Sequence, residues 1–481
     1  MTKINANSVF EFFKAMNQIP RVSGHEQAVS NWLVQFAKDR NLEVSQDEAW
    51  NVIIQKPATP GYENRPSIIL QGHIDMVGEK SHESNHDFLT DPIECIVDGE
   101  WMHANQTTLG ADNGMGVAMA LAVLDADDVA HGPITALFTT NEEVGMDGAT
   151  ALKAGQVDGQ YLLNIDTEVE GEFIVSCAGG SRVDFEIPAL KERHGKAYTE
   201  ALEITVDGLL GGHSGMEIHT QRANANQILA RLLVEVQKGY SFQLANFGGG
   251  TKHNAIPRKA QATILIRSED KEPVQNLINF YSQEFRAEFT PQDAGLTITS
   301  QTVETPVFVY IGDTTDALLS FLILAPHGVH SMAKAFDNLV ETSDNIAIVR
   351  EEKHTIHILV SIRSSSKTSL TFMEDKFLTL GRLLGIKATV AGSYPAWQYD
   401  AGSALEEQAI ALYKSFTGTE PTVTAVHAGL ECGLLKEILP NTQMISFGPT
   451  ITGAHTPQEQ VHIPSVERIY AYLVELLKEL K

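Results

Sequence analysis

The sequence predicts an α/β fold in which a doubly wound, mostly parallel sheet is interrupted by an inserted α+β domain. Three observations support this. Short, continuously apolar strands alternate with helices in the first part of the chain, and strands of alternating polarity fill the middle. Apolar strands that alternate with helices then return in the last part. Strands covered on both faces are apolar throughout, whereas strands with one wet face alternate. The first domain is predicted to comprise residues 1–182 and 395–481, and the insert residues 183–394.

The first domain opens with two helices and then alternates strands with a buried helix. One helix covers residues 9–16, and the second carries its apolar face through residues 28–36. Four short apolar runs predict buried strands, at residues 51–54, 67–70, 134–138 and 161–164. Between the second and third runs, residues 114–124 are apolar on all sides and long enough for a buried helix.

The insert carries alternating strands, such as residues 201–206 and 260–266, which are typical of antiparallel sheets. The pattern of the first domain then returns, with a helix over 404–416, an apolar strand over 443–447 and a final helix over 465–480. The insert also repeats an order of motifs at unequal spacing: His213, Asn254 and Arg267 in its first half, and His330, Asn345 and Arg363 in its second. The order favours an internal duplication and the spacing argues against one, so both alternatives stay open.

Composition excludes several kinds of partner. The chain has 481 residues, with 35 Lys and Arg against 61 Asp and Glu, so its formal net charge is −26. This charge argues against binding to nucleic acid or to an anionic membrane. The 3 cysteines are widely spaced and form no disulfide framework, and no apolar run of about 18 residues occurs. We therefore expect a cytoplasmic protein.

Polar residues gather where the predicted strands of the first domain stop. They follow successive strands or stand directly before the buried helix: His73, Asp75, Asp112, Glu142, Glu143, Asp166 and His455. Because sites in open α/β sheets form at the carboxyl ends of the strands, we expect these side chains to meet at one edge.

Such a set of ligands indicates metal chemistry. Imidazoles and carboxylates without a thiolate suit Zn²⁺, Mn²⁺ or Co²⁺, and a shared carboxylate suits a pair of ions. So many carboxylates would repel one another without cations. Two ions can share a water and lower its pKa, and the adjacent Glu142 and Glu143 offer one metal ligand and one free general base. The expected cofactor is a pair of divalent ions, for which zinc, cobalt and manganese are all suited to the ligands.

Each motif alone has a plainer explanation. An isolated His-x-Asp is commonly a turn with a solvated carboxylate, and a Glu-Glu pair is commonly a charge pair at a helix N-terminus. Asp112 suits a capped helix start, and His455 suits a surface histidine. Their joint occurrence at the strand ends of one sheet favours a metal hydrolase.

The motifs resemble those of the dinuclear zinc peptidase superfamily, which includes carboxypeptidase G-type enzymes, carnosinases and bacterial dipeptidases. The resemblance rests on residues 72–77, 110–114, 141–145, 164–168 and 453–455. The length, the wide insert and the stretch 427–433 bring the chain closest to the dipeptidases. The resemblance implies that the insert is a lid domain and that unblocked dipeptides, Xaa-His dipeptides included, are the substrates.

The resemblance also implies roles for the site residues. The metal ligands would be His73 and Asp166 for one ion, Glu143 and His455 for the other, and Asp112 as the bridge between them. Glu142 would be the general base for a water that bridges the metals, and Asp75 would fix the tautomer of His73.

From the lid, the resemblance implies three substrate-binding residues: His213, Asn254 and Arg363. The first two would reach the scissile carbonyl, and the arginine would hold the substrate carboxylate, which a guanidinium fork suits. Plainer roles are a turn histidine, a turn cap and an ion pair within the lid. Arg267 is a rival of Arg363 by the duplication argument, and His427 and Glu431 suit substrate contact or a structural role equally.

The expected reaction is hydrolysis of the peptide bond of unblocked dipeptides. The alternatives are a deacylase of N-acyl amino acids, a tripeptidase, and a non-catalytic binding relative, although an intact Glu142 argues against the last. A phosphatase would need basic residues near Asp112, and the sequence has none there. The sequence is compatible with a monomer and with a homodimer.

Overall fold

The computed structural model describes residues 6–481, which divide into two compact units. Unit 1 comprises the chain up to residue 176 together with residues 399–425 and 430–481, and unit 2 comprises residues 177–398 and 426–429. The boundaries expected from the sequence, after residues 182 and 394, differ from these by a few residues. The short stretch 426–429, which was expected in the first domain, packs with unit 2.

Unit 1 contains eight helices and twelve strands among the described residues. In chain order they are α1 (Asn7–Met16), α2 (Gln27–Asp39), β1 (Glu43–Gln46), β2 (Val52–Lys56), β3 (Ile68–His73), β4 (Cys95–Asp98), β5 (Trp101–Ala104), α3 (Ala111–Asp125), β6 (Ile134–Thr139), α4 (Glu142–Gly145), α5 (Asp147–Ala151), β7 (Tyr161–Asn164), β8 (Glu172–Cys177), α10 (Ala404–Thr417), β20 (Thr422–Val426), α11 (Glu431–Ile438), β21 (Gln443–Ser446), β22 (Ile451–Thr452), β23 (Gln460–His462) and α12 (Ile463–Glu479).

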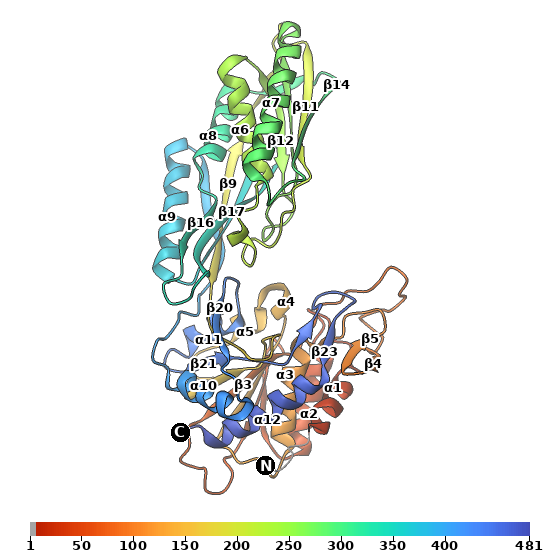
Figure 1. Cartoon of the computed structure of the whole chain (residues 1–481), viewed down its shortest axis with the longest axis vertical. Coiled ribbons are helices and arrows are strands. Elements are labelled where there is room, and N and C mark those ends of the chain that lie inside the picture. Colours follow the sequence, from red (N-terminus) through yellow and green to blue (C-terminus); the bar gives the residue numbers. More distant parts are fainter. Residues whose placement is uncertain (1–5) are drawn as a thin grey trace. The chain divides into compact units, whose positions relative to one another are not determined.

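The main sheet of unit 1 has eight strands in the order β1-β2-β6-β3-β7-β21-β8-β20. Its strands β3, β20 and β21 are labelled in Figure 1. Its four central strands, β6, β3, β7 and β21, run parallel to one another. Strands β1 and β2 continue the sheet in antiparallel fashion at one edge, and β8 is antiparallel to β21. An apolar run reports burial on both faces and carries no direction, so the sequence could not show that β2 is antiparallel.

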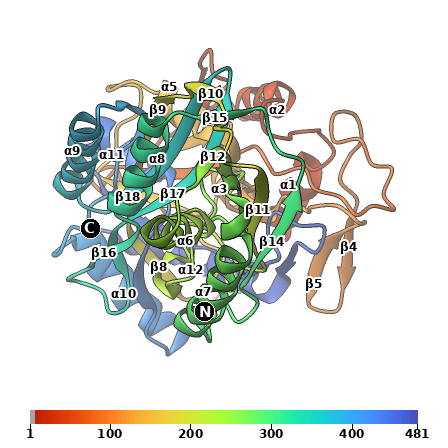
Figure 2. The same ribbon diagram turned by 90° about the horizontal axis from the view of Figure 1, so that it is seen from above.

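A second, four-stranded sheet of unit 1 joins distant parts of the sequence, in the order β22-β23-β5-β4. Strands β4 and β5 form an antiparallel hairpin (Figure 2), and β23 pairs with β5. This sheet places the segment that follows His455 beside the segment that precedes Asp112.

The buried helix expected from the sequence is α3. Its residues from Asn113 to Leu124 are buried, because a helix that is apolar on all sides finds no wet face. It packs on α1 and on β3. Asp112 and Asn113 have non-helical backbone angles, so Asp112 lies at the kinked N-terminal end of this buried helix.

Unit 2 contains four α-helices, two short 3-10 helices and eleven strands. They are β9 (Gly179–Pro188), β10 (Lys191–Arg193), β11 (Glu200–Asp207), η1 (Ile218–Thr220), α6 (Ala225–Gly239), β12 (Gln243–Gly249), β13 (Ala260–Ile266), η2 (Ser268–Asp270), α7 (Lys271–Phe289), β14 (Thr297–Val303), β15 (Phe308–Tyr310), α8 (Gly312–Leu324), β16 (Gly328–Met332), β17 (Val340–Glu352), β18 (Thr355–Ser364), α9 (Lys367–Leu384) and β19 (Lys387–Tyr394).

The large sheet of unit 2 repeats one topology twice. Its path is β14-β11-β13-β12-β17-β18-β9-β19, and its printed ladders are antiparallel. Strands β11, β12, β13 and β14 have helices α6 and α7 after the first and third strand, and β9, β17, β18 and β19 have α8 and α9 at the same places. In both halves the spatial order is fourth, first, third, second. The first half is inserted between β9 and α8 of the second, which is why the sequence motifs are unequally spaced.

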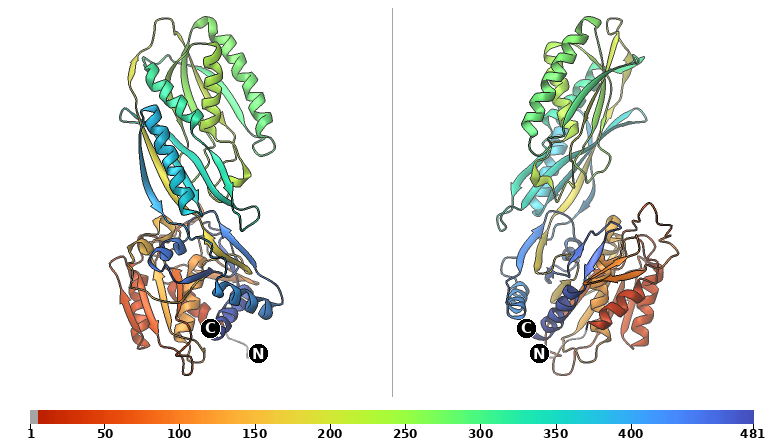
Figure 3. Two further views of the ribbon diagram at one scale, coloured as in Figure 1. Left: turned by 90° about the vertical axis from the view of Figure 1, so that its left-hand side faces the viewer. Right: turned by 45° about the vertical axis from the view of Figure 1, so that its right-hand side comes forward.

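Helices α6, α7, α8 and α9 lie along one face of this sheet (Figure 3). The core between helices and sheet is apolar and includes the aromatic cluster of Phe185, Phe321 and Phe377. Across residues 6–481, every helix is too short or too polar to cross a lipid bilayer.

Candidate metal centre

Neighbouring parallel strands bring several of the sequence-predicted residues to one edge of the unit 1 sheet. Strand β3 ends at His73, which is in register with Thr139 at the end of β6. Strand β7 is in register with β3 on its other side, and Asp166 follows it by two residues. Because the three strands are parallel, the segments that follow them start at the same edge.

The Asp112 carboxylate lies between two histidines. Its Oδ1 is 3.2 Å from Nε2 of His73, and its Oδ2 is 3.2 Å from Nε2 of His455. Asp166 Oδ1 lies 3.6 Å from the same nitrogen of His73, and Glu143 Oε2 lies 3.0 Å from that of His455. Each histidine therefore faces one carboxylate of its own and one shared carboxylate.

These separations fit divalent metal ions. Two ligand atoms that bind a zinc ion at about 2.0–2.1 Å with tetrahedral angles lie roughly 3.3 Å apart. The four N···O separations run from 3.0 to 3.6 Å. Ligand atoms of His73, Asp112 and Glu143 all lie within 4.8 Å of one another. The buried Oδ1 of Asp166 has no hydrogen-bond partner among residues 6–481, as expected of an atom kept for a cation.

Asp75 holds both His73 and the segment that carries the two glutamates. Nδ1 of His73 faces the Asp75 backbone oxygen at 3.2 Å and its Oδ1 at 3.3 Å. Since both are acceptors, Nδ1 carries a proton, which leaves Nε2 as the nitrogen that would bind a metal ion. The same carboxylate accepts the backbone N–H groups of Glu142 at 3.0 Å and of Glu143 at 3.3 Å.

The charges of the site are strongly coupled. Hydrogen bonds that His455 donates to the carboxylates of Asp112 and Glu143 raise the pKa of His455 to about 11. Burial disfavours the charged form of Asp112, but the bonds to His455 and His73 hold its pKa below the usual range. Burial raises the pKa of Asp166 well above its ordinary value, with His73 opposing. Protons thus balance the negative charge of the metal-free protein, and cations would replace them.

Glu142 sits beside this cluster as a carboxyl that retains its proton easily. Burial raises the pKa of Glu142 to about 8, the charge of His73 opposes this, and repulsion from Glu143 and Glu431 adds to it. A carboxyl with a pKa near neutrality is suited to take up and release protons.

Two backbone positions at the site are left-handed without being glycine. His455 has φ 62°, and Asn141, directly before Glu142, has φ 53°. Such positions cost roughly 1–3 kcal/mol each and occur preferentially at functional sites. The backbone is therefore in a less favourable conformation at His455 and directly before Glu142.

The remaining predicted residues lie in unit 2. Nδ1 of His213 accepts the backbone N–H groups of Gly215 at 3.3 Å and Met216 at 3.0 Å, so the proton of the neutral ring is on Nε2. Burial, and then the charge of Arg363, lowers the pKa of His213 to about 4. The backbone oxygen of Asn254 accepts the N–H of Ser214 at 2.8 Å, which fixes Asn254 beside this turn.

Arg363 and His427 gather beside His213. A Cβ on Gly215 would lie 3.0 Å from Nε of Arg363 and 2.4 Å from the backbone oxygen of His427, so only glycine permits this approach. Arg363 donates to the hydroxyl of Tyr394 at 2.8 Å, while its buried Nε has no hydrogen-bond partner in the described chain.

Arg267 lies at the far end of the same sheet. Arg267 follows the last residue of β13. The first residue of β13, Ala260, pairs with Gly249 of β12, which in turn pairs with Val349 of β17. Arg363 instead pairs with Ser343, near the other end of β17. The fold therefore separates Arg267 from the cluster of His213, Arg363 and His427.

Four further charged residues lie near the centre: Arg21, Glu431 and Glu459 are buried, and Glu168 is partly buried. Glu431 accepts hydrogen bonds from Gln71 and Thr139 at 2.6 Å each, and burial raises its pKa to about 7. Burial and the charge of Asp112 raise the pKa of Glu168 to about 7. The sequence left Glu431 open between substrate contact and a structural role, and it gave Glu168 no role of its own within the motif 164–168. Arg21 and Glu459 stand outside the motifs, where an isolated charged residue resembles a surface residue.

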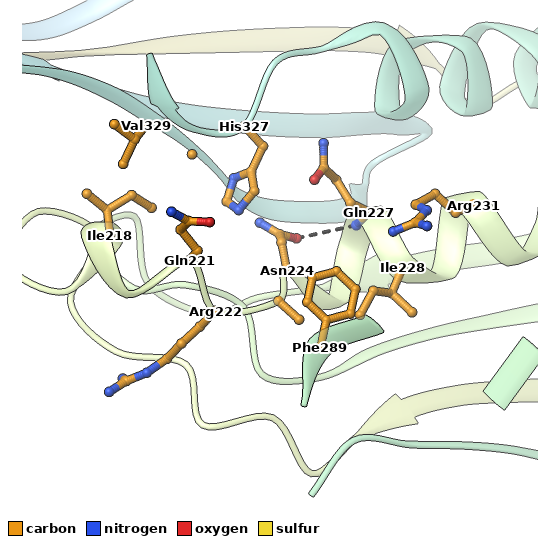
Figure 4. Close-up of a pocket in the computed structure, with 12 residues that line it drawn as sticks. Ile218, Gln221, Arg222, Asn224, Gln227, Ile228, Arg231, Phe289, His327 and Val329 are labelled. Carbon is orange, nitrogen blue, oxygen red and sulfur yellow. Dashed lines mark hydrogen bonds between the residues drawn. The ribbon is translucent and has the colours of Figure 1, made fainter. Parts of the chain in front are cut away.

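A cavity of about 360 Å³ lies elsewhere in unit 2, between α6 and the segment before β16 (Figure 4). Its two arginines are engaged, Arg222 with Glu217 at 2.9 Å and Arg231 with Glu288 at 2.7 Å. The cavity therefore offers no uncommitted guanidinium, and none of the predicted site residues lines it.

The chain belongs to Peptidase family M20/M25/M40, whose family model matches residues 69–479. It is 38% identical over 481 residues to the cytosol non-specific dipeptidase of Escherichia coli (strain K12), an alignment that covers 100% of this chain and 99% of that protein. The crystal structure of aminoacylhistidine dipeptidase from Vibrio alginolyticus superposes with a TM-score of 0.91 at 37% identity and covers 100% of this chain and 98% of that one. A tripeptidase from Staphylococcus aureus, with a TM-score of 0.56 at 16% identity over 99% of both chains, shares the fold.

Proposed function

We propose that this protein is a dipeptidase that uses two divalent metal ions to hydrolyse unblocked dipeptides, Xaa-His dipeptides included. The observation that carries the proposal is the Asp112 carboxylate, with one oxygen 3.2 Å from His73 and the other 3.2 Å from His455. The full-length similarity to two dipeptidases supports the choice of substrate.

We assign one ion to His73, Asp166 and Asp112, and the second to Glu143, His455 and Asp112. When bound, the two ions polarise the peptide carbonyl and make a water between them acidic enough to react near neutral pH. Zinc suits this N/O ligand set, and cobalt and manganese suit it as well.

Glu142 is assigned as the general base and then the general acid. Its backbone N–H donates to the Asp75 carboxylate at 3.0 Å, and Glu143 is the next residue in the sequence. It takes the proton of the attacking water and returns it to the leaving amine. Asp75 acts only through its neighbours: it orients His73 and the segment that carries the base.

Residues of unit 2 are assigned to the substrate. The neutral His213 presents Nε2–H as a donor to the carbonyl oxygen, on which negative charge develops. Arg363 is assigned to the C-terminal carboxylate, for which a guanidinium provides paired donors. Asn254 is assigned to the scissile carbonyl together with His213. Its backbone oxygen accepts the N–H of Ser214, the residue after His213.

The experiment that tests this function is metal analysis combined with a substrate panel on the purified full chain. The panel contains Ala-His, Gly-Gly, a tripeptide and an N-acetyl amino acid. We expect two divalent ions per chain and turnover of the dipeptides. Preferential turnover of the tripeptide or the N-acetyl amino acid would contradict a dipeptidase and favour a related amidohydrolase, and no turnover with both ions bound would favour a binding protein.

We infer a cytoplasmic location from the 38% identical cytosol dipeptidase and from the three cysteines without a disulfide pattern. Monomer and homodimer are both compatible with the assignment, since every proposed metal ligand comes from one chain. Light scattering on the purified protein decides between them.

A further inference from the structure

A buried carboxylate is fixed to the segment that carries Asp112. Glu459 is 2% exposed and lies just before β23. Its Oε2 accepts the backbone N–H groups of Leu109 at 2.7 Å and Gly110 at 3.0 Å. Its Oε1 accepts those of Ala111 at 2.7 Å and Asp112 at 3.3 Å. One side chain thus binds four consecutive amides, the last of which belongs to the proposed bridging ligand.

A buried guanidinium holds the same segment through its carbonyl group. Arg21 is 2% exposed and donates to the Gly110 oxygen at 2.7 Å. It also donates to the backbone oxygens of Ile74 at 3.1 Å and Asp75 at 3.3 Å, directly after His73. Arg21 therefore ties the segment of one proposed metal ligand to the segment of another.

The two glycines of the 110–114 motif make room for this arginine. A Cβ on Gly110 would lie 2.4 Å from Nη2 of Arg21, and a Cβ on Gly114 would lie 2.7 Å from the same atom. Gly110 also has φ 71°, a conformation that glycine adopts without strain. The motif thus owes its glycines to the guanidinium, while its aspartate faces the site.

We propose that Glu459 and Arg21 form a buried charged clamp, one gripping the amides and the other the carbonyl of residues 109–112, and that this clamp positions the Asp112 carboxylate between His73 and His455. The inference rests on the proposed function, because it takes Asp112 to be a metal ligand. Glu459 and Arg21 touch neither metal nor substrate in this account and are positioning residues.

The geometry explains why a carboxylate is needed at position 459. All four neighbours of its oxygens are N–H donors, so each oxygen must be an acceptor. An amide in its place would turn an NH₂ group toward two N–H groups and leave them without a partner, which costs most in a buried setting. A neutral apolar residue would leave all four amides unsatisfied. The negative charge of Glu459 in turn favours the charged form of Arg21, which burial disfavours.

The test is Glu459→Gln in the full chain, with binding of Co²⁺ to the metal-free protein followed by calorimetry and by the visible absorption spectrum. We expect both Co²⁺ ions to bind at least tenfold more weakly and the spectrum to change, because a displaced Asp112 alters both coordination spheres. With saturating metal, kcat should fall while KM stays within about twofold.

The matched control is Asp293→Asn in unit 2. Asp293 is also fully buried and accepts two backbone N–H groups, from Leu210 and Ala223, at 2.7 Å each. We expect this variant to bind both Co²⁺ ions like the parent. Unchanged affinity and spectrum in Glu459→Gln, or an equal loss in Asp293→Asn, would overturn the clamp.

Failure of the proposed function gives a different result. If the parent chain itself binds fewer than two Co²⁺ ions, the metal assignment is wrong and the clamp falls with it. If the parent binds two and Glu459→Gln binds them equally, only the clamp is wrong. Should Glu459→Gln not fold, Glu459→Asp keeps the charge and shortens the reach. We expect Glu459→Asp to bind Co²⁺ more weakly than the parent chain does, and parent-like binding would refute the clamp.

Discussion

At the scale of single residues, the chemistry divides between side chains that bind metal and one that moves protons. Glu142 and Glu143 are neighbours in sequence, yet only Glu143 approaches His455, at 3.0 Å. Glu142 instead has a pKa raised to about 8 by burial, opposed by His73 and reinforced by the charges of Glu143 and Glu431. Adjacent carboxylates can therefore serve as ligand and base.

The first prediction concerns Glu142→Ala. Loss of a general base costs about 10²–10⁴-fold, so kcat should fall by that factor while the metal content stays near two ions per chain. Steady-state kinetics together with elemental analysis of the same preparation provides the measurement. A loss of metal equal to that in Glu143→Ala would show that Glu142 is a ligand.

The residues that follow the strands, Asp75 included, were predictable from the sequence, whereas the buried residues that support the Asp112 segment were not. His73, Asp112, Glu143 and His455 stand in motifs whose spacing from predicted strands can be read directly. Glu459 contacts residues 348 to 350 positions away, from Leu109 to Ala111, and only the pairing of β23 with β5 brings them together. Long-range contacts of this kind leave no periodic signal in the sequence.

At the scale of elements, equivalent strands of the duplicated unit 2 sheet carry arginines with different surroundings. Arg363 lies near the end of β18 beside His213, whereas Arg267 follows β13 and is exposed at the opposite end of the sheet. The duplicated topology thus preserves the arginine in sequence order without preserving its environment.

The second prediction follows from this difference. Arg363→Ala should raise KM for Ala-His by roughly 10- to 100-fold, because a charge-assisted pair with the substrate carboxylate contributes about 1.5–3 kcal/mol. The matched variant Arg267→Ala should stay within about twofold of the parent. The C-terminal amide of Ala-His gives a further readout, since Arg363→Ala should lose the preference for the free acid. A larger effect of Arg267→Ala would reverse the assignment.

The third prediction concerns a buried histidine next to β17. His427 is 5% exposed and faces the Ser343 hydroxyl at 2.7 Å, and burial, then Arg363 and His213, lowers its pKa to about 3. The unfolded chain takes up a proton near pH 6.5, while the folded chain does so only near pH 3. His427 therefore reduces stability as the pH falls through this window.

Urea unfolding of the metal-free full chain at pH 7 and pH 5 measures this effect. The parent should lose about 2 kcal/mol more of its unfolding free energy between these pH values than His427→Gln does. Equal losses in the two proteins would mean that His427 is protonated in the folded state.

At the scale of the whole molecule, the change from apolar strands to strands of alternating polarity and back was enough to predict an interrupted α/β domain. The insert between residues 182 and 395 was expected because its strands alternate in polarity. Its nested duplication, with one βαββαβ half inserted after β9 of the other, could not be decided from unequal motif spacing. Strand direction at the sheet edges was equally hidden, since burial patterns carry no direction.

The central claim is that five dispersed residues of unit 1 hold two metal ions with Asp112 between them. Anomalous diffraction from zinc-loaded crystals of the full chain measures this directly. We expect two zinc peaks about 3.5–4 Å apart, one beside His73 and one beside His455, with Asp112 bound to both. A single peak, or peaks away from Asp112, would contradict it.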